Sequence, residues 1–269
     1  MRNDCPNIGL IIVGDEILSG KRADAHLPKV IEILAARGLN LSWARYAGDE
    51  RSRITADLRH AHASGDIVFS CGGIGATPDD HTRQCAAAAL GLELELHPQA
   101  HGFILQRMQE QALEQGVVYE PDRPDNVHRL NMAKFPKGAR IIPNPFNKIA
   151  GFSTGRVHFV PGFPVMAWPM IEWVLDNEYA HWHQPVQVQE RSVIVMGAIE
   201  ALLTPLMERI EADFHGIKVF SLPSVDHPQF GKHIELGVKG HAELLDASYA
   251  ALVQGLHKVG ASIGPEMVR

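Results

Sequence analysis

Residues 67–80 read IVFSCGGIGATPDD, an apolar run that ends in a glycine cluster and a pair of aspartates. The continuous apolar run Ile67–Cys71 predicts a buried strand. The glycines after it let backbone N–H groups point into one concavity, which suits an anion such as phosphate. The carboxylates of Asp79 and Asp80 would repel that anion. A bridging Mg²⁺ would neutralise the carboxylates and the phosphate together. Capping of the next helix by Thr77 or Asp79 is the alternative, but it leaves the three glycines unexplained.

Strands and helices alternate on both sides of this stretch, with connections of a few residues. This order predicts an α/β fold, a doubly wound and mainly parallel sheet covered by helices on both faces. Ligands of such sheets bind beyond the carboxyl ends of the strands. The expected strands are 8–13, 39–46, 67–71, 140–142 and 157–160, and the expected helices are 24–37, 49–64, 82–90, 98–115 and 164–177.

A second and smaller unit is expected from about residue 184, after a break at His181–Pro185. Its pattern predicts strands at 186–195, 217–222 and 232–238 and helices at 199–214 and 242–259, an α+β sandwich of the split type. We therefore predict two domains, residues 1–180 and 184–269.

Two more loops follow predicted strands. Gly14-Asp15-Glu16 follows the first strand, and its carboxylates suit a divalent cation or a polarised water, or equally the first turn of a helix. Val160–Pro164 reads VPGFP and turns the chain into a helix. The segment Asn144–Asn147, NPFN, has the composition of a turn.

Composition limits the possible partners and compartment. The 269 residues are 45% hydrophobic and carry a net charge of −6 with a pI near 6.2, which argues against nucleic acid held by charge. Three cysteines without a CxxC pair indicate a reducing compartment. No apolar window reaches the length of a membrane span, and the N-terminus lacks the pattern of a signal peptide. We expect a cytoplasmic protein without a membrane partner.

Four motifs together, GDEILSGK, CGGIGATPDDHT, PNPFNKIAGF and VPGFPVM, resemble the molybdopterin-binding domain family. That family includes MoaB, MogA and the N-terminal domain of CinA-type proteins, and the CinA type matches best, over about residues 7–178. The region after Gln184 resembles the small KH-like α/β module of the same proteins.

The resemblance implies roles for particular residues. Glu16, Asp79 and Asp80 are the implied catalytic residues, and Glu16 and Asp80 the implied ligands of Mg²⁺ or another divalent cation. The implied substrate-binding residues are Gly14, Asp15, Ser19, Gly72, Gly73, Gly75, Thr77, Asn144, Pro161, Gly162 and Pro164. The chain departs from the CinA type at Ala76, where proline is usual, and at Lys148, which offers a possible phosphate contact.

The resemblance implies a small-molecule ligand, a nucleotide or pterin phosphate. Metal-dependent hydrolysis of a nucleotide pyrophosphate of the ADP-ribose type is the favoured activity. Adenylyl transfer to molybdopterin and a non-catalytic pterin- or nucleotide-binding module are the alternatives. By analogy with its relatives, the protein is expected to be a homo-oligomer.

RNA binding by the second unit is disfavoured. Gly237–Gly240 matches the GxxG of KH modules, where that motif joins two helices, but here it is predicted to join a strand to a helix. From Ala180 onward seven Lys and Arg face ten Asp and Glu, a net charge of −3, which opposes a phosphate-tracking surface.

Overall fold

The computed structural model describes residues 5–184 and 188–268, and the chain divides into two compact units, 1–183 and 184–269. The elements of the first unit are β1 (Ile8–Val13), α1 (Asp15–Leu18), α2 (His26–Ala35), β2 (Trp43–Ala47), α3 (Arg51–Ser64), β3 (Ile67–Cys71), α4 (Thr82–Leu90), β4 (Leu94–Leu96), α5 (Pro98–Glu114), α6 (Pro124–Leu130), the 3-10 turn η1 (Asn131–Ala133), β5 (Lys134–Pro136), β6 (Arg140–Ile142), β7 (Gly151–Thr154), β8 (Val157–Val160), α7 (Pro164–Glu178) and η2 (Ala180–Trp182).

The first unit is built on a mixed sheet in the order β2-β1-β3-β8-β7-β6. Neighbours from β2 to β8 pair in parallel, whereas β7 is antiparallel to both β8 and β6. The predicted doubly wound, mainly parallel sheet is confirmed. Strand β7 was not predicted, because its residues GFST have little apolar character.

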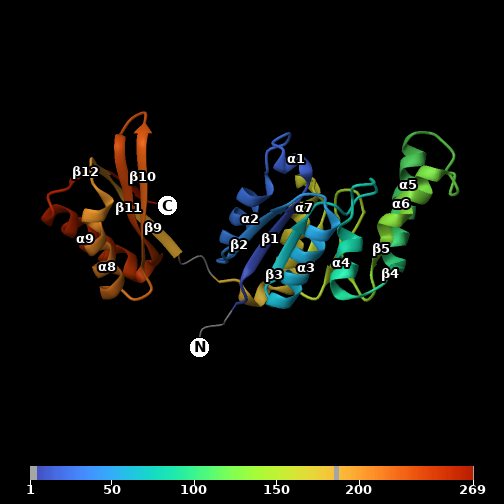
Figure 1. Cartoon of the computed structure of the whole chain (residues 1–269), viewed down its shortest axis with the longest axis horizontal. Helices are drawn as coiled ribbons and strands as arrows, with labels where there is room; N and C mark the ends of the chain where they lie inside the picture. Colours follow the sequence, from blue (N-terminus) through green and yellow to red (C-terminus); the bar gives the residue numbers. More distant parts are fainter. Residues whose placement is uncertain (1–4, 185–187, 269) are drawn as a thin grey trace. The chain divides into compact units, whose positions relative to one another are not determined.

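Alternate residues of the strands face two separate cores. Ile11 and Val68 pack with α3, α4 and α5, while Leu10 and Phe69 pack with α2 and α7 on the opposite face. Figure 1 shows helices on either side of the sheet, with α5, α6 and the paired strands β4 and β5 beyond α4. Burial on both faces explains why β1 and β3 are continuous apolar runs in the sequence.

The second unit contains β9 (Val188–Met196), α8 (Glu200–Asp213), β10 (Lys218–His227), β11 (Gly231–His241), α9 (Ala242–Lys258) and β12 (Ser262–Val268). Its antiparallel sheet has the order β10-β11-β9-β12, and its core is separate from the two of the first unit. The smaller α+β unit is confirmed. Of the strand predicted at 186–195, residues 186 and 187 lie outside the described residues, as does Pro185 of the predicted break.

Strand β12 and the position of Gly237–Gly240 are two features of the second unit that differ from the prediction. Strand β12 was not predicted, because Gly264 and Pro265 interrupt its pattern where the register shifts between Ile263 and Glu266. Gly237–Gly240 lies inside β11 and not between two helices. The segment therefore does not form the loop that a GxxG motif makes in KH modules.

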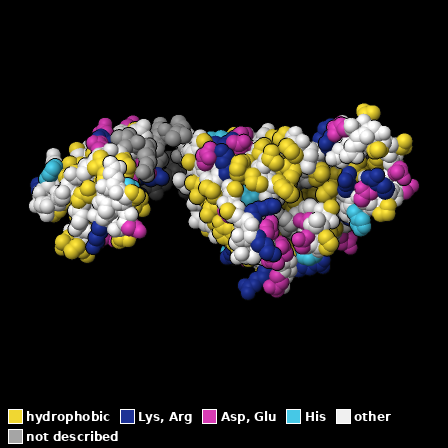
Figure 2. All heavy atoms as spheres, turned by 90° about the horizontal axis from the view of Figure 1, so that it is seen from above, with side chains coloured by type: hydrophobic (Ala, Val, Ile, Leu, Met, Phe, Trp, Pro, Cys, Tyr) yellow, Lys and Arg dark blue, Asp and Glu magenta, His cyan; other side chains and the backbone are white. Residues whose placement is uncertain are grey.

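On the face drawn in Figure 2, basic and acidic side chains are interspersed and not separated by sign. No helix in residues 5–184 or 188–268 combines the length and the apolar character needed to cross a bilayer.

Candidate functional site

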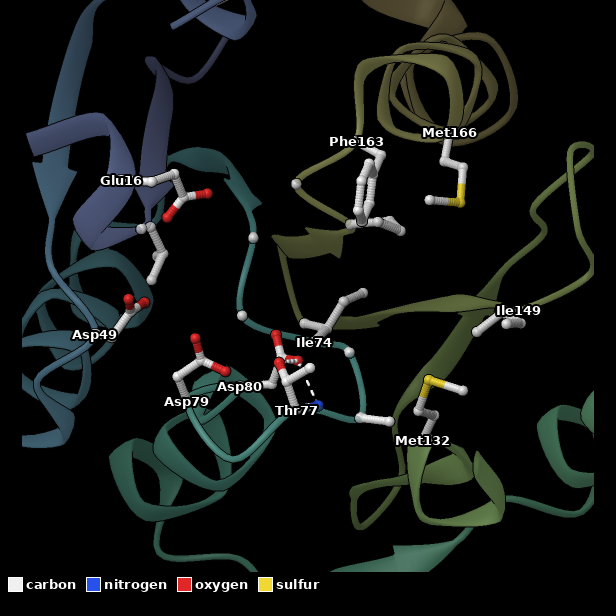
Figure 3. A pocket seen from close by; sticks show the side chains of 18 of the residues that line it. Glu16, Asp49, Ile74, Thr77, Asp79, Asp80, Met132, Ile149, Phe163 and Met166 are labelled. Atoms are coloured by element: carbon white, nitrogen blue, oxygen red, sulfur yellow. Dashed lines mark hydrogen bonds between the residues drawn. The ribbon is translucent and has the colours of Figure 1, made fainter. Parts of the chain in front are cut away.

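Four loops meet where parallel strands end. Because β1, β2, β3 and β8 run in the same direction, the residues after them leave the sheet at one edge. A cavity of about 400 Å³ opens there. Each of the four loops contributes a lining residue, namely Gly14, Asp49, Gly72 and Pro161. Figure 3 shows carboxylates on one side of this cavity and apolar side chains on the other.

Gly72 serves the packing of the sheet. Its φ is +105°, and a Cβ at this position would lie 2.3 Å from the carbonyl oxygen of Val13. Its N–H donates to the carbonyl of Val160 at 3.0 Å. The prediction that all three glycines present their N–H groups to an anion is therefore wrong at Gly72, whose N–H joins β3 to β8.

The next four residues are different. In the described part of the chain, no protein acceptor takes the N–H groups of Gly73, Ile74, Gly75 and Ala76. All four residues line the cavity. Gly73 has a φ of +70°, and a Cβ there would lie 2.2 Å from Thr82 Oγ1. A run of free backbone N–H groups on a concave surface is a favourable environment for an anion.

The turn after the glycines is held by Asp80. Thr77 donates to Asp80 Oδ2 from its N–H at 2.9 Å and also from its hydroxyl. Helix α4 begins at Thr82 with His81 as its N-cap residue, so the alternative that Thr77 or Asp79 caps this helix is wrong. The guanidinium of Arg83 also stabilises this turn, because it donates a hydrogen bond to the carbonyl of Gly75 at 2.6 Å.

Acidic side chains gather at the cavity from three loops. Glu16, Asp49, Asp79 and Asp80 all line it, and Figure 3 shows them on the same side. Burial raises the pKa of Asp49, and the charges of Asp15, Glu16 and Asp79 raise it further, while a backbone hydrogen bond opposes the rise. A cation among these carboxylates would relieve their mutual repulsion.

The donor set fits a cation shared with a ligand. Among the described residues, no group of three or more His, Cys, Asp and Glu is placed to hold a metal ion. Mg²⁺ is commonly bound by one or two carboxylates together with substrate phosphates. Glu16 and Asp80 fit that pattern, with the remaining ligands supplied by a phosphate and by water.

The opposite wall of the cavity is apolar. A cavity with one apolar wall and a few polar groups suits a flat heterocycle that carries phosphates. The side chains of this wall are Ile74, Met132, Ile149, Phe163 and Met166, of which Figure 3 labels every one.

The cavity brings together most of the residues singled out from the sequence. Those that line it are Gly14, Glu16, Gly72, Gly73, Gly75, Thr77, Asp79, Asp80, Pro161 and Gly162. Glu16, Gly73 and Asp80, which come from two distant loops, therefore share one cavity.

Four predicted substrate-binding residues do not line this cavity. Asp15 accepts a hydrogen bond from the Asp49 N–H at 3.2 Å, and Ser19 ends the short helix α1. Pro164 is the first residue of α7. Asn144 is buried and donates to Asn147 Oδ1 and to the Ile149 carbonyl at 2.8 and 2.9 Å. Asp15 and Asn144 therefore support the loops through hydrogen bonds, and none of the four residues lines the cavity.

Other lining residues were not predicted. Asp49 follows the carboxyl end of β2, so the strand-end rule applied to the other loops would have found it. Asn147, in the 144–147 turn, lines the cavity where Asn144 does not. Neighbouring Lys148, the suggested phosphate contact, does not line the cavity and forms an ion pair with Glu110. The lining residues that were missed are Val13, Arg22, Asp49, Ile74, Ala76, Met132, Asn147, Ile149, Phe163 and Met166.

Comparisons with known proteins agree with this fold. Residues 9–181 match the model of a family described as a probable molybdopterin binding domain. A CinA-like protein of Anaeromyxobacter sp. (strain K) is 32% identical over 175 residues, which cover 63% of this chain and 40% of that protein. A protein of Pyrobaculum calidifontis is 29% identical over 92% of this chain and 93% of its own length.

A solved structure is also similar. The crystal structure of the protein CinA, of unknown function, from Thermoplasma acidophilum has a TM-score of 0.53 and 26% identity, covering 64% of this chain and 98% of that one. The chain spans about two fifths of the length of the CinA-like relative from Anaeromyxobacter. With the family match covering more than half of its residues, the chain belongs to the molybdopterin-binding domain family, in its CinA-like type.

Proposed function

We propose that the first unit hydrolyses the phosphoanhydride of a nucleotide pyrophosphate of the ADP-ribose type with the help of Mg²⁺. This proposal rests on the residues that line the cavity at the carboxyl ends of the parallel strands. Carboxylates, free backbone N–H groups and an apolar wall together match a divalent cation, a phosphate and an adenine ring. The family description, a probable molybdopterin binding domain, supports a small phosphorylated heterocycle as the ligand.

Each part of the cavity has a role in this reaction. The N–H groups of residues 73–76 would hold a phosphate, and Glu16 and Asp80 would hold Mg²⁺. Such a cation, when bound, would neutralise charge on the anhydride oxygens and lower the pKa of water. Asp79 is the exposed carboxylate beside Asp80 and accepts the proton of the attacking water. Water adds across the anhydride, and ADP-ribose gives AMP and ribose phosphate.

Mass spectrometry of products tests the proposal. The full chain is incubated with Mg²⁺ and each of ADP-ribose, NAD, FAD and ATP. AMP and ribose phosphate should form from ADP-ribose and should be absent when the cation is chelated. Asp80→Ala should abolish turnover with its fold retained, whereas Asp122→Ala, an exposed control, should not. Absence of any product, or full turnover by Asp80→Ala, would refute the proposal.

Adenylyl transfer to molybdopterin is the second candidate, because the family model describes molybdopterin binding and the apolar wall also suits a pterin ring. With ATP, Mg²⁺ and molybdopterin it releases pyrophosphate. Hydrolysis of ADP-ribose releases none, so the released product separates the two reactions. Ligand binding without any product would indicate a non-catalytic module.

A further inference from the structure

A second cavity adjoins the first at the turn held by Asp80. It has a volume of about 370 Å³ and shares the lining residues Ala76, Thr77 and Asp80 with the first cavity. Its other walls come from α3, α4 with its N-cap residue, β4, α6, η1 and the start of β5. These elements contribute the cationic residues Arg51, Arg83 and Lys134, together with His81 and His128.

The charge of this second cavity is opposite to that of the first. Within residues 5–184 and 188–268, no carboxylate lies within ion-pair distance of Arg51, Arg83 or Lys134. Other basic side chains of the same unit are paired, such as Arg37 with Asp176 and Arg45 with Asp57. Asp80 is the acidic residue that lines the second cavity. Three cations facing one carboxylate leave an excess of positive charge.

Arg83 shows that the charge is built into the fold. It is 5% exposed, and its guanidinium donates to the carbonyls of Gly75 and Asn131 at 2.6 and 2.9 Å. Burial lowers its pKa, and the Asp80 charge opposes that shift. A buried guanidinium with two carbonyl partners retains unused N–H donors, and an anion would offset the cost of burying the charge.

We infer that this second cavity, lined by Arg51, Arg83 and Lys134, is a phosphate site beside the proposed catalytic cavity. Cationic groups from three separate elements suit a multiply charged anion such as phosphate, which offers oxygen acceptors in several directions. Arg51 begins α3, Arg83 lies in the first turn of α4, and Lys134 begins β5. The site extends the proposed function without depending on it.

Two sources supply such a phosphate. It is either a phosphoryl group of a ligand whose ring lies in the first cavity, or free phosphate bound separately. The shared turn at Thr77 lets one ligand contact both cavities.

Calorimetric titration of inorganic phosphate into the full chain at constant ionic strength tests the site. The double variant Arg51→Ala/Lys134→Ala should weaken phosphate binding by about tenfold or more, because two charged contacts to the anion are lost. The control is Arg53→Ala/Lys137→Ala. It removes the same net charge from exposed positions on α3 and just after β5, outside the second cavity. Its phosphate affinity should change by less than about twofold, because solvent screens those charges.

Equal loss in the two double variants, unchanged affinity in the first, or no phosphate binding by the wild type would overturn the inference. AMP identifies the source. If the phosphate belongs to the ligand, free phosphate competes with AMP and the Arg51→Ala/Lys134→Ala variant binds AMP more weakly. If it is a separate ion, AMP and phosphate bind together and AMP affinity is unchanged in that variant. None of these titrations requires turnover, so the site and the proposed hydrolysis fail independently.

Discussion

Gly72 connects the packing of the sheet to the shape of the cavity at the scale of a single residue. Its N–H joins two strands, and its missing Cβ lets β3 approach the end of β1. The same close approach places the following N–H groups at the cavity wall. A glycine that the sequence suggested for anion binding is therefore required first by the backbone.

Gly72→Ala should lower the free energy of unfolding by about 3 kcal/mol or more, because the new Cβ meets the Val13 carbonyl and φ is positive. Gly155→Ala is the matched control, since its φ is +59° with nothing within 4 Å of the added Cβ. It should cost about 1 kcal/mol from backbone strain. Urea unfolding measures both, and equal losses would contradict the role given to the contact.

His158 makes stability depend on pH. It is fully buried between Ser153, at 2.8 Å from Nδ1, and Tyr179, at 2.7 Å from Nε2, and burial lowers its pKa to about 3. The unfolded chain takes up a proton near pH 6.5 that the folded state refuses. Stability from this group is complete above pH 6.5 and should fall by up to about 1.4 kcal/mol per pH unit toward pH 3.

Chemical unfolding between pH 7 and pH 4 measures this slope. His158→Gln should reduce it, and His60→Gln, at an exposed position, should leave it unchanged. The same slope in wild type and His158→Gln would show that other groups cause it.

At the scale of elements, the strands with a continuous apolar run were predicted accurately from the sequence. Strands β1 and β3 are buried on both faces, and their apolar runs predicted them to the residue. The short strand β7 was missed because tertiary pairing with β8 defines it and local sequence does not. The strand-end rule and the family motifs predicted that Glu16, Asp79 and Asp80 share one site, and all three line the same cavity. The apolar wall at Met132 and Met166 was missed, because it comes from contacts between distant elements.

In the 144–149 turn, Asn144 supports residues that line the first cavity but does not line it itself. The side chain of Asn144 makes three hydrogen bonds, including one accepted from the Phe146 N–H at 3.0 Å, and it positions Asn147 and Ile149 at the cavity.

Asn144→Ala should lower stability by about 3 kcal/mol, since three hydrogen bonds are lost at a buried position. It should also weaken AMP binding. Asn177→Ala removes one exposed hydrogen bond and should cost about 1 kcal/mol or less. Thermal or urea unfolding with AMP titration measures both variants. Normal stability and affinity in Asn144→Ala would contradict the supporting role.

At the scale of the whole molecule, the two units have separate cores. No residue of the 184–269 core belongs to either core of the first unit, among the residues that the structure describes. Both cavities are lined by the first unit.

A chain ending at His183 should therefore fold and bind AMP and phosphate with the affinity of the full chain. Circular dichroism and calorimetry measure this. An unfolded or non-binding fragment would show that the second unit contributes to the site.

We propose that a cation and a phosphate meet at the cavity formed by Glu16, Asp80 and residues 73–76. A crystal structure of the full chain with Mn²⁺ and AMP would show both positions. Anomalous density for manganese should lie within coordination distance of Glu16 or Asp80, with a phosphate over the N–H groups of residues 73–76. Manganese without contact to these carboxylates, or AMP bound away from the cavity, would contradict the account.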